Sequence, residues 1–60
     1  MKTVEFYGEL HGETHNSIKV FDGAETIWIP KSQVVDQRHI KGVDYEFEVT
    51  EWIAKQKGII

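Results

Sequence analysis

The sequence contains no cysteine and only one proline among its 60 residues. Without thiols, the chain can form neither a disulfide framework nor a cysteine-ligated zinc site. No apolar run approaches the ~18–20 residues that span a bilayer, so we expect no membrane partner. Residues 1–5 lack the apolar core of a signal peptide, and we therefore expect a cytoplasmic protein.

The chain is long enough for a single small domain, residues 1–60. A chain of this size buries only about 60% of the surface that its unfolded form exposes, so its stability is marginal without dense packing or oligomerisation. Three phenylalanines, two tyrosines and two tryptophans make dense packing feasible. We expect a monomer or a homodimer, and the content of apolar residues excludes a disordered chain.

Charge is unevenly distributed around the net value of −3. Residues 31–41 contain three basic residues and one acidic residue, whereas residues 42–51 contain four acidic residues and no basic one. This pattern is typical of ordinary solvated surface, but it also fits one basic and one acidic patch on a small domain. An acidic protein attracts nucleic acid poorly unless its basic side chains cluster in space.

Alternation of apolar and polar residues predicts five strands. Gly8 lies within the first of them and indicates a bulge or a sharp bend, and residues 11–14 are expected to form a connection. Asp22 and Gly23 indicate a turn, and Pro30 ends the third strand because it has no N–H to donate. The predicted strands cover residues 3–10, 15–21, 25–29, 35–41 and 43–49.

A short helix is predicted at the C-terminal end, over residues 51–57. Thr50 is a suitable N-cap, Glu51 lies in the first turn, and two lysines lie in the last turn, as the helix dipole favours. Such a short helix is unstable alone, so Trp52 or Ile53 must pack it against the sheet. Ser32 is expected to cap a single helical or 3₁₀ turn before the fourth strand.

These elements predict a mainly β fold. The expected architecture is a small antiparallel five-stranded barrel or rolled sheet, of SH3-like or OB-like type, with a short C-terminal helix. The alternative is an α+β arrangement in which one helix packs on a two-layer sheet.

Two segments carry a resemblance to a known group of proteins. Residues 26–34 read TIWIPKSQV, and residues 50–58 read TEWIAKQKG. They resemble small bacteriophage and prophage proteins that share a W-[IL]-P-K-S strand end and a C-terminal E-W-[IL]-A helix ending in K-G. The resemblance implies a compact, non-enzymatic accessory protein, which would act in the cytoplasm of the host cell.

One segment contains residue types that bind metals. On an extended strand, His11, Glu13 and His15 would point to the same side, and imidazole and carboxylate groups are suitable zinc ligands. However, Gly12 and Thr14 favour a turn, which would separate the three side chains. We expect a solvated loop here, with no bound metal and no cofactor.

No constellation for catalysis is apparent, so we expect no enzyme. Ser17 and Ser32 lie outside any Gly-x-Ser-x-Gly elbow, and the glycines form no phosphate-binding pattern. A substrate pocket of ~300 Å³ or more is also difficult to build from sixty residues.

Contact surfaces are therefore the main functional candidates. We expect a protein-binding module, of accessory or inhibitor type, whose contacts include Glu46 and Glu48 on the acidic strand and the strand end at Trp28 and Lys31. The alternative is a small barrel that binds single-stranded nucleic acid, with aromatic side chains stacking on bases and cations neutralising phosphates. Trp28 would then be exposed, whereas a third possibility buries it with Trp52 beneath the C-terminal helix. The residues of the nucleic-acid hypothesis are Trp28, Tyr7, Lys31, Arg38 and Lys41.

Overall fold

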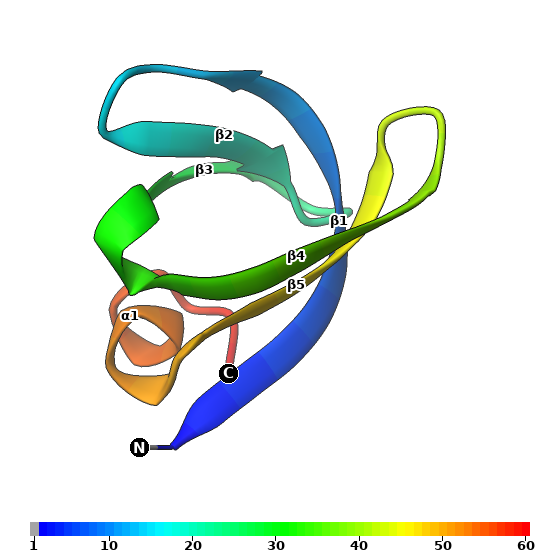
Figure 1. The fold of residues 1–60 in the computed structure, drawn as a ribbon. Coiled ribbons are helices and arrows are strands. Elements are labelled where there is room, and N and C mark those ends of the chain that lie inside the picture. The colour runs from blue at the N-terminus through cyan, green and yellow to red at the C-terminus, as the bar shows by residue number, and fades with distance from the viewer. Residues whose placement is uncertain (1) are drawn as a thin grey trace.

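A computed structural model describes residues 2–60 and contains one antiparallel sheet of five strands in the order β3-β2-β1-β5-β4 (Figure 1). A 3₁₀ turn, η1, joins β3 to β4, and one short helix, α1, follows β5. The elements are β1 (Thr3–Glu13), β2 (Ser17–Phe21), β3 (Thr26–Pro30), η1 (Lys31–Gln33), β4 (Val34–Lys41), β5 (Asp44–Thr50) and α1 (Glu51–Gln56).

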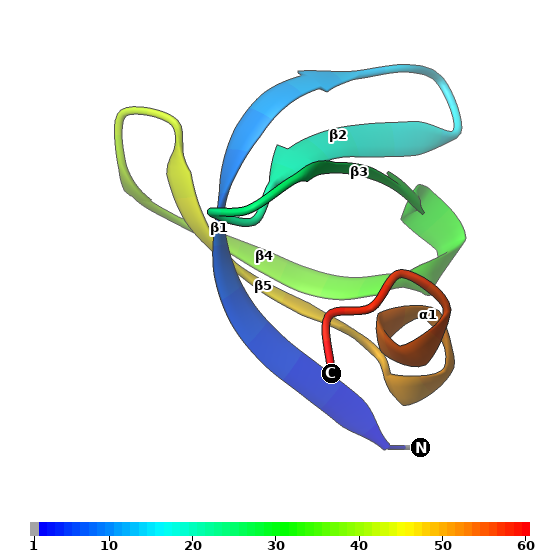
Figure 2. The same cartoon turned by 180° about the vertical axis from the view of Figure 1, so that it is seen from behind.

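The sheet rolls up without closing, and β3 and β4 form its two edges. Figures 1 and 2 show β1 curving through the whole molecule, with α1 at one end and the β4–β5 hairpin at the other. The prediction of a mainly β fold with five antiparallel strands and a C-terminal helix is confirmed. Of the two architectures expected first, the chain adopts the rolled sheet and not the closed barrel.

The core lies inside the roll, on one face of the alternating strands. Phe47 and Val49 of β5 are fully buried, as the alternation in this strand predicts. Ile53 and Ala54 of α1 are buried beside them, so the helix covers one end of the roll through Ile53 and leaves Trp52 exposed. The buried core consists of Ile18, Val20, Ile27, Ile29, Phe47, Val49, Ile53 and Ala54.

The first strand is longer than the sequence predicts. Residues 11–13, expected as a connection, continue β1 beyond a register shift between Leu10 and Gly12, so that Glu13 still pairs with Ile18 of β2. At Gly8 the strand passes so close to its neighbours that a Cβ atom would lie 2.7 Å from Val20 Cγ1. A side chain at position 8 would therefore clash with the core, whereas the irregularity expected at Gly8 lies further along the strand, between Leu10 and Gly12.

The helix begins and ends as its sequence predicts, apart from one residue. The Thr50 hydroxyl accepts a hydrogen bond from the Ile53 N–H at 3.3 Å, and Glu51 forms an ion pair with Lys55 at 3.5 Å. Lys57, expected in the last turn, is instead the C-cap. The expectation for Ser32 is wrong, because Pro30 occupies the N-cap position of η1 and no side chain caps this turn. Within residues 2–60, no helix has the length and apolar character needed to cross a membrane.

Candidate functional site

The outer surface of three neighbouring strands is rich in carboxylates. Strand pairing places Tyr7 of β1, Glu46 of β5 and Arg38 of β4 in one row across the sheet. The next row contains Glu5, Glu48 and Asp36 in the same strand order. Alternation along the strands turns all these side chains away from the core. We call this surface the acidic face, and its residues are Glu5, Tyr7, Asp36, Arg38, Glu46 and Glu48.

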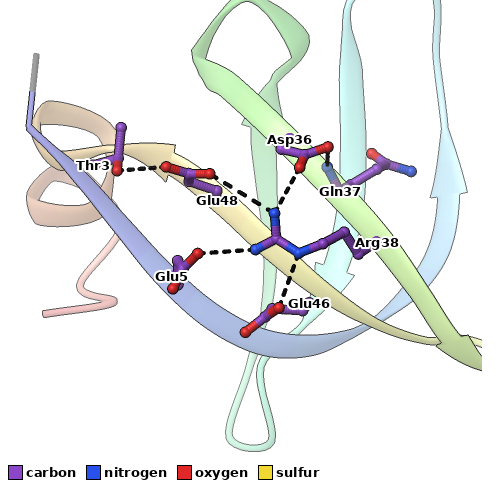
Figure 3. A network of polar contacts seen from close by, with 7 residues as sticks. All are labelled: Thr3, Glu5, Asp36, Gln37, Arg38, Glu46 and Glu48. Carbon is purple, nitrogen blue, oxygen red and sulfur yellow. Dashed lines mark hydrogen bonds and ion pairs between the residues drawn. The ribbon is translucent and has the colours of Figure 1, made fainter.

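Arg38 lies at the centre of the acidic face and contacts four carboxylates (Figure 3). Its Nε donates to Glu46 Oε1 at 2.9 Å, and its Nη1 donates to Asp36 Oδ2 at 2.6 Å. Its Nη2 donates to Glu5 Oε2 at 3.0 Å, and Glu48 Oε1 lies 3.8 Å from Nη1. One guanidinium thus connects β4 with the adjacent β5 and with β1, which is distant in sequence.

The network leaves an excess of negative charge on the surface. One cation faces four carboxylates, so the five side chains carry a net charge of 1 − 4 = −3 when all are ionised. The hydrogen bond that Arg38 donates to Glu46 raises the pKa of Arg38 above its ordinary value, so the guanidinium stays charged. The Thr3 hydroxyl also donates to Glu48 Oε2 at 2.7 Å, which fixes this carboxylate from its other side.

Tyr7 is the exposed aromatic residue of this surface. Its side chain is 67% exposed, although it pairs across the sheet with the partly buried Glu46. Exposed tyrosine side chains are typical anchors of protein interfaces, because they bury a large area with few rotatable bonds. The acidic face therefore combines fixed negative charge with an accessible aromatic ring.

The other half of the sheet presents Trp28 to solvent. Trp28 is 45% exposed, and Lys19 Nζ of β2 lies 6.0 Å from its ring centroid. Trp52 of α1 is exposed as well, so the two tryptophans are not buried together beneath the helix. The cation nearest to Trp28 is thus Lys19, a residue that the sequence did not single out.

The basic residues expected to surround the aromatic side chains do not form one patch. Lys31 Nζ forms an ion pair with Glu13 Oε2 at 2.6 Å, and Arg38 is surrounded by carboxylates. Lys41 lies opposite Asp44 in the β4–β5 hairpin. Each of these cations therefore lies beside at least one carboxylate, which weakens the positive potential that a phosphate backbone requires.

The three candidate metal ligands are engaged elsewhere or lie apart. His11 Nε2 contacts Glu9 Oε1 at 2.8 Å, and Glu13 pairs with Lys31. His15 lies beyond the end of β1, in the loop before β2. In the part of the chain that the structure describes, no three histidine or carboxylate side chains are positioned to hold one metal ion.

Two partners of Arg38 were not found from the sequence. Glu5 is 33 residues from Arg38, and the pairings of β1 with β5 and of β5 with β4 bring them together. Asp36 lies two residues before Arg38, and alternation within β4 alone places both on one side of the strand. The Asp36 contact was therefore detectable from the sequence, whereas the Glu5 contact required the strand order.

Compared with known proteins, the chain matches no family model, no curated protein and no solved structure.

Proposed function

We propose that this protein is a non-enzymatic binding module that recognises a basic protein partner through its acidic face. The arrangement of four carboxylates around Arg38 supports this proposal most strongly. The guanidinium holds carboxylates from β1, β4 and β5 in fixed positions before any partner arrives. Groups that are already ordered lose less conformational entropy on binding, and complementary charge accelerates association.

The chemistry of the face favours a protein over a nucleic acid. The chain carries a net charge of −3, and the exposed Tyr7 ring lies among carboxylates that repel phosphate. A lysine- or arginine-rich protein segment matches both the charge and the aromatic ring, because cations also bind to ring faces. The role of a phage-type accessory protein or inhibitor, implied by the two sequence motifs, agrees with action by contact alone.

A second candidate function is supported by a different surface. Trp28 is exposed with Lys19 above its ring, and this pair is of the kind that stacks on a base and contacts a phosphate. Single-stranded nucleic acid would then bind over β2 and β3. We rank this function second, because Lys31 and Arg38 are already paired with carboxylates.

Fluorescence anisotropy separates the two functions. The full chain is titrated into a labelled peptide of arginine, lysine and glycine, and into a labelled single-stranded oligonucleotide, at low and at moderate salt. We expect saturable binding of the basic peptide that weakens as salt rises, and no binding of the oligonucleotide at tens of micromolar. Glu5→Gln removes one carboxylate of the face, and Glu51→Gln is the matched control on α1.

The outcomes assign the function. Weaker peptide binding by Glu5→Gln, with no change by Glu51→Gln, supports recognition at the acidic face. Equal weakening by both variants indicates attraction by net charge without a defined face, and contradicts the proposal. Binding of the oligonucleotide that is lost in Trp28→Ala would assign the second function instead.

A further inference from the structure

A groove of about 350 Å³ opens at the end of the roll opposite α1. It lies where β1 passes between the β2–β3 turn and the β4–β5 hairpin, the three segments that line it (Figures 1 and 2). Gly8 contributes bare backbone to the lining, since the neighbouring Val20 leaves no room for a Cβ atom there. The absence of a side chain at Gly8 thus leaves the backbone of β1 open to the groove.

The apolar part of the lining is mainly aromatic. Tyr7, Phe21 and Tyr45 face the groove together with Ile40, of which Tyr7 and Ile40 are 67% and 54% exposed. The Tyr45 ring is held between two other rings, with its centroid 5.7 Å from that of Phe47 and 5.1 Å from that of His39. The groove therefore presents an uncovered aromatic surface in which at least one ring is already fixed.

The charged part of the lining is entirely acidic, and consists of Glu9, Asp22 and Asp44. Hydrogen bonds from the backbone N–H groups of Glu25 and Ala24 lower the pKa of Asp22, which therefore stays ionised. Within residues 2–60, Asp44 forms no ion pair, whereas Glu9 contacts His11. Negative charge thus lies beside aromatic rings with no lysine or arginine in the lining.

We propose that this groove binds one arginine or lysine side chain of the basic partner. The alkyl stem would pack on Ile40 and Tyr45, and the cationic end would lie over an aromatic ring beside Asp44. Asp44 lies opposite Lys41 in the hairpin but forms no ion pair with it. This inference rests on the proposed function, and it names the anchor of that interaction. A nucleotide whose base entered the groove would bring its phosphate close to three carboxylates, which disfavours nucleotide binding here.

Amide NMR on the ¹⁵N-labelled full chain tests the groove directly. The ligands are a blocked pentapeptide of glycine with a central arginine, and the same peptide with citrulline, which has a similar shape without the charge. We expect the arginine peptide to shift the amides of residues 7–9, 21–23 and 40–45, with a dissociation constant on the order of millimolar. Citrulline should bind about tenfold more weakly.

Two charge variants distinguish binding in the groove from attraction by the overall negative charge of the protein. Asp44→Asn should weaken binding of the arginine peptide by about three- to fivefold. Glu51→Gln, with the same change in charge, should leave this affinity unchanged. Equal binding of the arginine and citrulline peptides, or equal effects of the two variants, would overturn the inference. Amide shifts confined to the acidic face around Arg38, or no amide shifts at all, would also overturn the inference.

The longer basic peptide distinguishes this failure from failure of the proposed function. Suppose that the longer peptide binds and that Glu5→Gln weakens this binding, while the amides of residues 7–9, 21–23 and 40–45 do not shift with the arginine peptide. The groove inference alone is then wrong. If neither basic peptide binds, the proposed function is wrong as well. If the oligonucleotide shifts the groove amides, the groove binds nucleotides and the inference is wrong.

Discussion

The two faces of β5 differ in burial and in charge. On the inner face, Phe47 and Val49 are completely buried, and no polar or charged residue among residues 2–60 is buried with them. On the outer face, Glu46 and Glu48 contact Arg38 and remain partly exposed. One strand therefore supplies both the packing that stabilises the fold and the charge that we assign to binding.

The physical difference between the faces predicts that stability and binding are separable. Burial of apolar area contributes about 25 cal/mol per Å², and a cavity in a packed core adds a further penalty. Exposed ion pairs contribute little to the free energy of unfolding, because water and salt screen them. Substitutions on the inner face should therefore reduce stability, whereas those on the outer face should chiefly alter binding.

The largest effect is expected from Phe47→Ala on the inner face. Loss of this ring should reduce the free energy of unfolding by about 3–5 kcal/mol, which is enough to unfold much of a domain this small. Urea denaturation followed by tryptophan fluorescence measures the change. The control is Glu46→Gln, one residue earlier on the outer face. A comparable loss of unfolding free energy in this variant would contradict the claim that stability and binding depend on different faces of β5.

A smaller loss is expected from Gly8→Ala, which tests how tightly β1 passes the core. The new Cβ atom would lie 2.7 Å from Val20 Cγ1 and 3.1 Å from the Phe21 carbonyl oxygen. We expect a loss of about 1–3 kcal/mol in the same denaturation experiment. Gly12→Ala in the same strand meets no atom within 4 Å and should be neutral or slightly stabilising. An equal change in the free energy of unfolding for Gly8→Ala and Gly12→Ala would show that the close approach of β1 to Val20 does not restrict position 8.

Arg38→Met tests the outer face, and its effect on stability should be smaller than that of Gly8→Ala. Without the guanidinium, four carboxylates repel one another across β1, β4 and β5. We expect a lower melting temperature at low salt and recovery toward the wild-type value at high salt, because salt screens the repulsion. A decrease in melting temperature that does not depend on salt would indicate that the aliphatic stem of Arg38 stabilises the fold by packing.

The smallest expected effect concerns Asp22, which contacts backbone N–H groups in the β2–β3 turn and belongs to neither face. Its pKa is lowered in the folded chain, so the stability that it contributes is present above its ordinary value of 3.8. This contribution is lost as the pH falls below 3.8 through the lower folded value. Asp22→Asn should remove this part of the acid dependence in melting curves, and an unchanged dependence would refute the assignment.

Much of the fold follows from local sequence patterns. The alternation over residues 43–49 identified the inner and outer faces of β5, and Thr50 marked the start of α1. The end of β1 was predicted wrongly, because a register shift at Leu10 to Gly12 continues a strand whose sequence is typical of a loop. Strand boundaries depend on pairing as well as on local composition, and pairing is not visible in a single sequence.

Less of the candidate site was predictable. Glu46, Glu48 and Arg38 were predicted to contact a partner, and Arg38 was expected to join other cations near Trp28, whereas it lies in a cluster of carboxylates. Its position follows from the pairing of β4 with β5, which sets Arg38 opposite Glu46. The groove could not be anticipated, because its lining comes from β1, the β2–β3 turn and the β4–β5 hairpin, which are separated in the sequence.

Tyr7→Thr is the sharpest test of binding through the acidic face, because the Tyr7 side chain is 67% exposed on that face and lies outside the core. Binding of the labelled basic peptide and urea unfolding are measured on the same preparation. We expect the affinity to fall by about fivefold or more, with the free energy of unfolding changed by less than about 0.5 kcal/mol. Unchanged affinity in a folded variant would contradict the assignment of binding to this face.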